Sequence, residues 1–127
     1  MSSIFTKIIQ REIPAHIVYE DEMTLAFLDI RPVSEGHLLV VPKLEVDELQ
    51  DLEPDMYQAV MTTVHKMARL LKEKLNPKRV GLVVYGFDVP HAHVHLIPME
   101  GPGKIQLQHT EKVTEAELIS THQVLTS

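Results

Sequence analysis

Cysteine is absent from this chain of 127 residues, which excludes disulfide bonds and thiolate metal ligands. Lysine and arginine form no cluster and the formal net charge is −6. We therefore predict no nucleic-acid partner, because a long nucleic acid needs a basic face. The apolar run at residues 38–41 is far too short to span a membrane, and no basic segment followed by an apolar run opens the sequence. We expect no membrane association, and a cytoplasmic location agrees with the missing cysteine.

Length and composition are those of one globular domain. Hydrophobic residues make up 44% of the chain and charged residues 24%, and a chain of this length buries one core. No internal repeat or linker-like stretch divides the sequence. We predict a single domain over residues 1–127, in which residues 103–127 form a more polar, partly helical C-terminal tail.

Apolar periodicity predicts the secondary structure. Residues 51–75 repeat apolar side chains at three-to-four spacing, which indicates one long amphipathic helix. A shorter helix is predicted over residues 114–124. Apolar segments between turn residues predict five strands, at residues 18–20, 24–30, 37–42, 80–85 and 91–98. Because short loops join consecutive strands, we expect an antiparallel sheet and the α+β class rather than a doubly wound α/β fold.

Three histidines alternate with small or apolar residues in the segment His-Ala-His-Val-His-Leu-Ile at residues 91–97. Side chains at i, i+2 and i+4 share one face of a β-strand, so His91, His93 and His95 should line one polar strip. The residues between them then face a core. Imidazole titrates near neutral pH and serves as nucleophile, acid, base or metal ligand. We therefore expect the chemistry of the protein at this strip.

Four interpretations of the strip compete. A solvated strand face with histidines by chance suits one histidine better than three. Metal binding is chemically reasonable, but the motif has no cysteine or acidic residue to complete the ligand set. Alternatively, one imidazole attacks phosphorus while its neighbours donate hydrogen bonds to the phosphate oxygens. The last interpretation is a pH-sensitive binding surface without turnover, and the spacing does not separate it from covalent catalysis.

The other five histidines carry less information. His65 lies within the predicted long helix, and His109 and His122 lie in the polar tail, where surface or packing roles are expected. His16 follows a turn and has no evident role. His37 opens a buried strand, so it either reaches a site at the strand end or packs in the core.

These motifs together resemble the histidine triad (HIT) superfamily, whose signature is three histidines alternating with apolar residues. Residues 91–97 fit that signature throughout. Upstream blocks resemble the Hint-type nucleotide hydrolase and transferase branch, and they read IFTKII at 4–9, EIPA at 12–15, FLDIRP at 27–32 and GHLLVVPK at 36–43. The likeness covers roughly residues 4–98. It implies a HIT-like α+β fold and a homodimer.

The resemblance also implies an enzyme that acts on the α-phosphate of a nucleoside 5′-phosphate conjugate, such as a phosphoramidate. In that scheme His93 attacks phosphorus and forms a nucleotidyl-histidine intermediate, which water then hydrolyses. His91 orients His93, partly through its backbone carbonyl, while His95 and His37 contact the phosphate oxygens. The chemistry needs no metal or other cofactor, and the partner is a small nucleotide.

A nucleoside pocket is implied beside the triad. The ribose-binding acid of the family corresponds to Asp29, whose carboxylate can accept from two vicinal hydroxyls. The simpler role for Asp29 is to cap a turn before Pro32. The nucleobase cleft corresponds to apolar residues that could equally be core, namely Ile4, Phe5, Ile8, Phe27, Ile30 and Leu39.

Two positions depart from the Hint-type pattern. Phe87 and Asp88 stand where that branch carries Gln and then Ser or Thr before the triad. Phe87 cannot donate a hydrogen bond to phosphate. An ionised Asp88 would repel phosphate. Asp88 could instead act as an acid, contact an amine-bearing leaving group or face elsewhere. Two rival functions stay open: a nucleotide-binding scaffold with little turnover, which the missing Gln and Ser or Thr suggest, and a metal-binding protein that uses the same three histidines.

Overall fold

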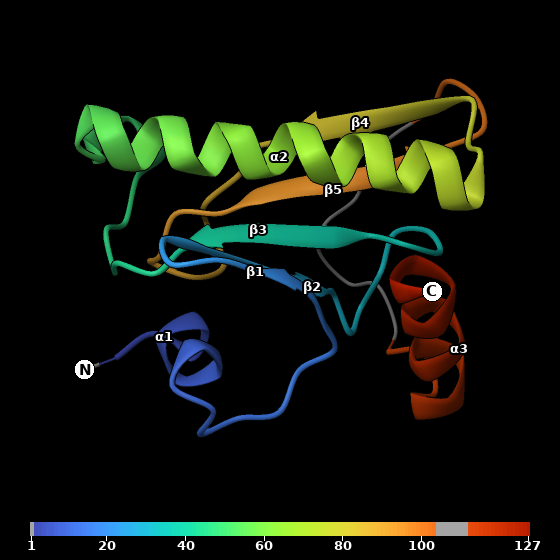
Figure 1. Cartoon of the computed structure of the whole chain (residues 1–127), viewed down its shortest axis with the longest axis horizontal. Helices are drawn as coiled ribbons and strands as arrows, with labels where there is room; N and C mark the ends of the chain where they lie inside the picture. Colours follow the sequence, from blue (N-terminus) through green and yellow to red (C-terminus); the bar gives the residue numbers. More distant parts are fainter. Residues whose placement is uncertain (1, 104–111) are drawn as a thin grey trace.

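The computed structural model describes residues 2–103 and 112–127 (Figure 1). Within them the chain forms one five-stranded sheet, with every neighbouring pair antiparallel and the strand order β1-β2-β3-β5-β4. The strands are β1 (Ile17–Glu20), β2 (Thr24–Leu28), β3 (Leu38–Pro42), β4 (Arg79–Val83) and β5 (Val94–Met99). The helices are α1 (Ile4–Ile9), the short 3₁₀ helix η1 (Leu49–Asp51), α2 (Pro54–Leu75) and α3 (Glu115–Thr126). The predicted α+β class and antiparallel sheet are confirmed.

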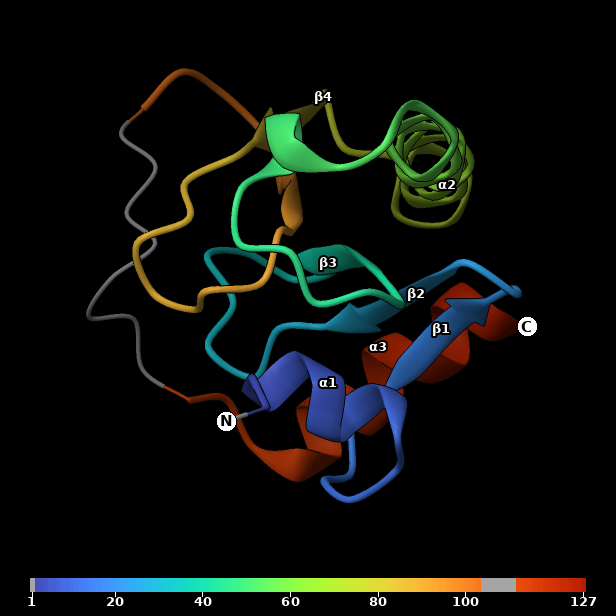
Figure 2. The ribbon, with the colours of Figure 1, turned by 90° about the vertical axis from the view of Figure 1, so that its left-hand side faces the viewer.

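The sheet lies between two hydrophobic cores. Successive side chains of its central strands point to opposite faces, and those on both faces are apolar. On β3, Leu38 and Val40 belong to the larger core under α2, whereas Leu39 and Val41 belong to a smaller core on the other face. Helix α1 contributes to that smaller core. Figure 2 shows α2 and α1 on opposite sides of the sheet. Helix α3 packs against β1 and α2, and it adds apolar side chains to the larger core.

Three sequence predictions need correction. Helix α1 was not among the predicted elements, although Ser3 caps it by accepting a hydrogen bond from the backbone N–H of Thr6. Strand β5 begins at Val94 rather than residue 91, because the N–H of Ala92 donates to the carbonyl of Val46 in a loop instead of to a neighbouring strand. Strand β2 ends at Leu28, so residues 29 and 30 lie in the following turn.

The remaining boundaries shift by a few residues. The long helix begins at Pro54, after the short η1 turn, and ends at Leu75 as predicted. Strand β3 begins one residue after His37, β4 covers residues 79–83 instead of 80–85, and α3 extends beyond the predicted end at residue 124. His109 lies outside the described residues. No helix in the described part of the chain is long and apolar enough to cross a membrane.

Candidate active site

Four buried histidines gather on the face of the sheet that carries α1. His95 on β5 pairs with Leu39 on β3, so its side chain shares the face of the smaller core. His37 directly precedes β3, and His91 and His93 occupy the extended segment before β5. All four side chains are almost completely removed from solvent, at 0–2% exposure. His91 and His93 therefore precede the strand rather than belong to it. The three side chains nevertheless lie together on one side, as predicted.

His91 is anchored on both ring nitrogens. Its Nε2 lies 2.9 Å from the carbonyl oxygen of Pro42, and its Nδ1 lies 2.8 Å from the hydroxyl of Ser3. Because a carbonyl only accepts, the proton of His91 is on Nε2, and Ser3 donates to Nδ1. The Ser3 backbone N–H and the Thr6 hydroxyl in turn donate to the carboxylate of Glu45, at 2.7 and 2.6 Å.

This support for His91 was not predicted from the sequence. Ser3 and Glu45 are 42 residues apart, and Ser3 and His91 are 88 apart, so no local pattern connects them. The one available signal was a serine directly before an apolar run, which is typical of a helix N-cap.

His93 presents a free lone pair. Its Nδ1 donates to the backbone carbonyl of His91 at 2.7 Å, which leaves Nε2 without a proton in the neutral ring. Nε2 is buried and has no hydrogen-bond partner among the described residues. Phe5 packs edge-on against the ring at a centroid distance of 4.9 Å and so restricts its orientation. The predicted role of the His91 carbonyl in orienting His93 therefore has its hydrogen bond in place.

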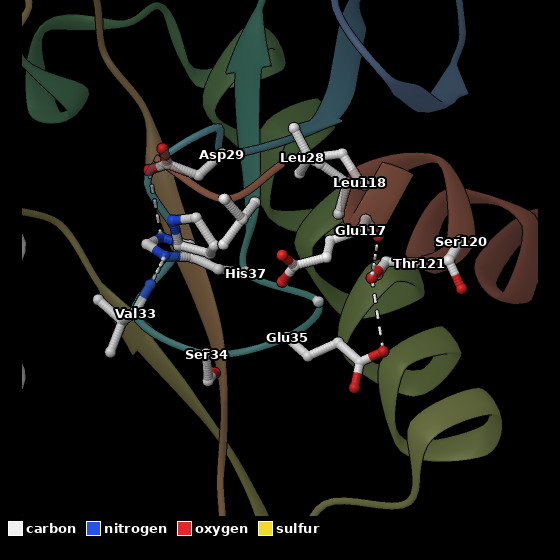
Figure 3. A pocket seen from close by; sticks show the side chains of 13 residues that line it. Leu28, Asp29, Val33, Ser34, Glu35, His37, Glu117, Leu118, Ser120 and Thr121 are labelled. Carbon is white, nitrogen blue, oxygen red and sulfur yellow. Dashed lines mark hydrogen bonds and ion pairs between the residues drawn. The ribbon is translucent and has the colours of Figure 1, made fainter. Parts of the chain in front are cut away.

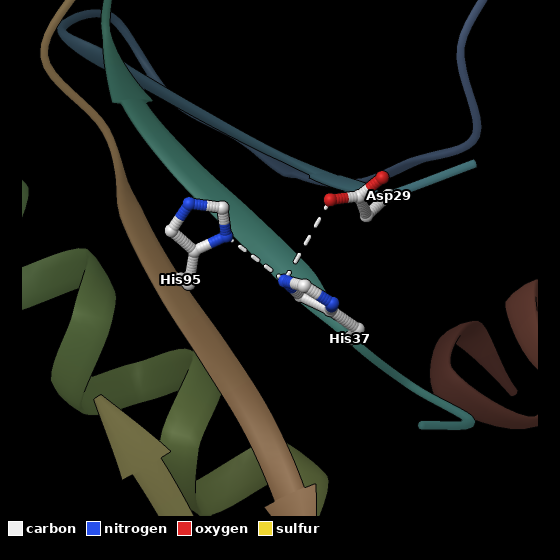
Figure 4. Close-up of side chains that lie close together, drawn as sticks. All are labelled: Asp29, His37 and His95. Carbon is white, nitrogen blue, oxygen red and sulfur yellow. Dashed lines mark hydrogen bonds and ion pairs between the residues drawn. The ribbon is translucent and has the colours of Figure 1, made fainter. Parts of the chain in front are cut away.

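His37 and His95 form a hydrogen-bonded chain (Figure 4). The backbone N–H of Val33 donates to His37 Nδ1 at 3.0 Å, so the proton of His37 is on Nε2. That Nε2 lies 2.9 Å from Nδ1 of His95 and donates to it. The proton of His95 is consequently on its own Nε2, which is also buried without a hydrogen-bond partner in the described part of the chain.

These protonation states hold at neutral pH because burial favours the uncharged imidazoles. Burial, together with the neighbouring His95, lowers the pKa of His37 to about 3. Burial and the charge of His93 lower the pKa of His95 to about 4, against an opposing effect of Asp88. The pKa of His91 is lowered as well, mainly by burial.

The lone pair of His93 and the N–H donor of His95 thus lie side by side without hydrogen-bond partners among the described residues, and the two rings are 5.0 Å apart. Buried polar atoms without partners are rare in folded proteins and call for an explanation. A nucleophile next to a donor suits attack on a centre that carries an oxygen, such as a phosphoryl group.

Asp29 lies beside His37 at the mouth of this site. Its Oδ1 accepts from the backbone N–H of Arg31 at 2.8 Å, so the predicted turn cap is present. Its Oδ2 lies 3.7 Å from His37 Nε2, as Figure 4 shows. Burial raises the pKa of the Asp29 carboxyl, and the charge of Asp88 adds to this effect.

The predicted nucleobase residues fall into two groups. Phe5, Ile8, Phe27 and Leu39 are buried in the smaller core next to the triad, so core packing is part of their role. Ile4 and Ile30 are 47% and 46% exposed. Of the six residues, only Ile4 and Ile30 therefore keep enough apolar surface for a ligand to contact, whereas the other four side chains are covered.

A cavity of about 460 Å³ adjoins Asp29 and His37 on another side (Figure 3). It opens between the turn at residues 32–36 and helix α3, where the hydroxyl of Thr121 donates to Glu35 at 3.4 Å. None of the six predicted apolar cleft residues lines it. This cavity was not predicted from the sequence, because residues 29–37 and α3 meet only in the folded chain.

The other described histidines lie away from the site. His16 contacts Glu115 of α3 at 3.0 Å, and His122 of α3 donates to the carbonyl of Ile17 at 2.7 Å. Both therefore fasten α3 to the start of β1, a structural role that was not predicted for His16. His65 is exposed on α2, as expected for a surface residue.

Two groups of side chains are close enough to share a metal ion among the described residues, Asp29 with His37 and His95, and Asp88 with His93 and His95. In the first group His37 and His95 already share a hydrogen bond, and the two nitrogens are only 2.9 Å apart. The second group contains both partnerless nitrogens. Only the second offers an imidazole lone pair that is free in the arrangement described.

An α+β fold with an antiparallel sheet, and three alternating buried histidines around the start of β5, is typical of a histidine triad protein. Comparison with known proteins agrees. The family model of the HIT domain matches residues 10–101. The chain belongs to the HIT family. It is 44% identical over 108 residues to an uncharacterized HIT-like protein of Methanocaldococcus jannaschii. This match covers 80% of this chain and 83% of that protein.

Two further relatives extend the comparison. The purine nucleoside phosphoramidase of Escherichia coli is 32% identical over 105 residues, covering 75% of this chain and 85% of that protein. The crystal structure of a Hit-like protein involved in cell-cycle regulation from Bartonella henselae superimposes with a TM-score of 0.87 at 30% identity. The match covers 98% of this chain and 94% of that one. The family and fold predicted from the sequence are confirmed.

Proposed function

We propose that this protein hydrolyses nucleoside 5′-phosphoramidates or closely related nucleotide conjugates, with His93 as the nucleophile. The observation that carries the proposal is the pair of buried, partnerless nitrogens on His93 and His95. The name of the E. coli relative, a purine nucleoside phosphoramidase, supports this substrate class. The substrate would be a small molecule, and the proposed steps require no cofactor.

In the first step the Nε2 lone pair of His93 attacks phosphorus and the P–N bond breaks. The electron pair of that bond goes to the leaving nitrogen, which takes up a proton and departs as an amine. The ring of His93 then carries positive charge, and the His91 carbonyl at 2.7 Å from Nδ1 stabilises it. In the second step water attacks phosphorus, the P–Nε2 bond breaks, one proton is released, and the nucleoside monophosphate leaves.

His95 Nε2–H would donate to a non-bridging phosphate oxygen during both steps. The chain from Val33 through His37 keeps that proton on Nε2, the side that faces the phosphate. His37 then acts through His95 rather than touching the phosphate itself, which modifies the role that the family resemblance implied for it.

The nucleoside would bind beside the triad. Oδ2 of Asp29 is free to accept from a ribose hydroxyl while Oδ1 stays bonded to the turn. The base would lie on the apolar surface of Ile4 and Ile30 above Phe5, Phe27 and Leu39.

Amine release from an adenosine 5′-phosphoramidate of 2-hydroxyethylamine, called the neutral conjugate below, tests the proposal. We expect turnover in the wild type, and a rate below about a thousandth of that value in His93→Ala. An acid-quenched reaction should contain protein that carries one covalently bound adenylyl group on His93. The matched control is His65→Ala, an exposed histidine on α2, which should keep full activity. Full activity in His93→Ala would refute the proposal.

The same assay addresses two rival functions. Tight binding of the neutral conjugate without turnover would indicate a nucleotide-binding scaffold. A metal site on Asp88, His93 and His95 is the other rival, because His93 Nε2 and the Asp88 carboxylate are 3.2 Å apart, close to the separation of about 3.3 Å between ligands of a tetrahedral ion. Turnover that is lost in EDTA and restored by zinc would favour the metal.

We also propose a homodimer that forms through β4. In the described part of the chain this strand lies at the edge of the sheet and pairs with β5 alone. Unpaired edges are prone to pair with another chain. Leu82 on β4 is 50% exposed, which leaves apolar surface at that edge. Light scattering should give twice the mass of the chain, and Leu82→Lys should give the monomer mass.

A further inference from the structure

The Asp88 carboxylate lies next to Nε2 of His93, the nitrogen proposed to attack phosphorus. It lies in the loop between β4 and β5, and its Oδ1 is 3.2 Å from His93 Nε2. No hydrogen bond joins the two atoms, since Nε2 has no hydrogen-bond partner among the described residues. The Asp88 oxygen therefore lies beside the lone pair without being bonded to it. The side chain is 45% exposed, so it approaches the buried nitrogen from the solvent side.

The field of this carboxylate extends across the site. The charge of Asp88 contributes to the raised pKa of Asp29 on one side and opposes the lowering of the pKa of His95 on the other. Because Asp88 lies 3.2 Å from His93 Nε2, a phosphoryl group that this nitrogen attacks must lie close to Asp88, with the leaving group one bond beyond phosphorus.

Among the described residues, little positive charge is available near the triad to balance Asp88. His37, His91 and His95 are neutral at pH 7 because their pKa values are lowered. Lys43 and Arg11 both pair with Glu20. The charge of Arg31 acts on Asp29, where it lowers the pKa of the carboxyl.

We propose that Asp88 selects the leaving group by its charge, so that this protein prefers phosphoramidates whose departing amine carries a further positive charge. Conjugates with anionic leaving groups, such as pyrophosphate or an amine that bears a carboxylate, are disfavoured. The physical basis is charge complementarity, since a fixed carboxylate attracts an ammonium group and repels an anion held nearby. This inference rests on the proposed hydrolase function and specifies its substrate class.

Three adenosine 5′-phosphoramidates of similar size test the inference. The amines are ethylenediamine, which adds an ammonium group, 2-hydroxyethylamine, which is the neutral conjugate, and glycine, which adds a carboxylate. We expect kcat/KM in the wild type to fall by roughly tenfold from the cationic to the neutral conjugate, and by about as much again to the anionic one. Because Asp88 is partly exposed, raising the salt concentration should narrow the differences.

Asp88→Asn keeps the shape of the side chain and removes its charge. In this variant we expect the three conjugates to differ by no more than about threefold, mainly through faster hydrolysis of the anionic one. The matched control is Asp51→Asn, which makes the same change of net charge at an exposed position of η1. It should keep the wild-type order.

The outcomes separate this inference from the proposed function. If the wild type hydrolyses all three conjugates equally, or if Asp88→Asn keeps the wild-type preference, the inference is refuted while the hydrolase function stands. If the wild type hydrolyses none of the three conjugates, the hydrolase function fails. The inference is then decided by the dissociation constants of the three conjugates: the same order, abolished by Asp88→Asn, supports charge selection at Asp88, and equal affinities refute it.

Discussion

His37 donates a hydrogen bond from Nε2 to Nδ1 of His95 over 2.9 Å, and this contact determines which nitrogen of His95 carries a proton. His37 can donate there because the backbone N–H of Val33 occupies its other nitrogen at 3.0 Å. A turn of the main chain thereby sets the proton position on a side chain that would face the phosphate.

Replacing His37 tests that connection. In His37→Phe, His95 loses its donor and can hold its proton on either nitrogen, so we expect kcat to fall by about 10- to 100-fold with little change in KM. His37→Gln should retain more activity, since its amide nitrogen can reach the same position and still donate. Steady-state kinetics with the neutral conjugate measures both variants. An unchanged kcat in His37→Phe would contradict the role assigned to the contact.

Ser3 should support catalysis from a distance. Ser3→Ala removes the donor to His91 Nδ1 and also the N-cap of α1, so we expect a loss of about 1 kcal/mol in the free energy of unfolding. We also expect kcat to decrease about threefold to tenfold, because His91 holds His93 through its carbonyl. Ser2→Ala, at an exposed position, is the control. If Ser3→Ala loses stability but keeps the wild-type kcat, Ser3 has only a structural role.

The sequence predicts the parts of this site that local patterns encode. Alternating apolar residues identify the buried strands, and the placement of His37 before β3 brings it to the triad, since β3 and β5 are neighbours. Local patterns do not encode the contacts of His91 with Ser3, of Thr6 with Glu45, or of α3 with the turn before His37. Each depends on how elements far apart in the sequence pack together, and hence on the complete fold.

Strand β5 illustrates the same limit within the motif. Perfect alternation at residues 91–97 predicts one continuous strand, but the backbone of residues 91 and 92 bonds to Val89 and Val46 instead. Alternation reports which side chains share a face, and it does so correctly here. It does not report whether a neighbouring strand is present to accept the backbone hydrogen bonds.

The buried imidazoles should make stability depend on pH. Unfolded histidines bind a proton near pH 6.5, whereas His95 and His37 in the folded protein do so only at about pH 4 and 3. The unfolded state therefore holds more protons below pH 6.5, and the free energy of unfolding should fall as the pH drops from 7.5 to 5.5. Each such histidine contributes a limiting slope of about 1.4 kcal/mol per pH unit.

Denaturant unfolding of the wild type and of His95→Asn across that range measures the effect. The difference in free energy of unfolding between the two proteins at pH 7.5 gives the effect of the substitution on packing. The change in that free energy from pH 7.5 to 5.5 gives the effect of proton binding. The variant should lose less stability on acidification than the wild type. Identical losses in both proteins would mean that His95 is not held neutral by the fold.

Gly36 and Gly86 allow backbone strain to be separated from steric contact. Both have positive φ angles, of 90° and 81°, which residues other than glycine rarely adopt. A Cβ atom at Gly86 meets open space, whereas one at Gly36 would lie 2.4 Å from Cδ1 of Leu75 and 3.3 Å from Cγ of Pro98. We expect Gly86→Ala to lower the free energy of unfolding by roughly 1 kcal/mol, and Gly36→Ala by roughly 2–3 kcal/mol. Equal losses in denaturant unfolding would show that the side chain of Leu75 moves aside at little cost.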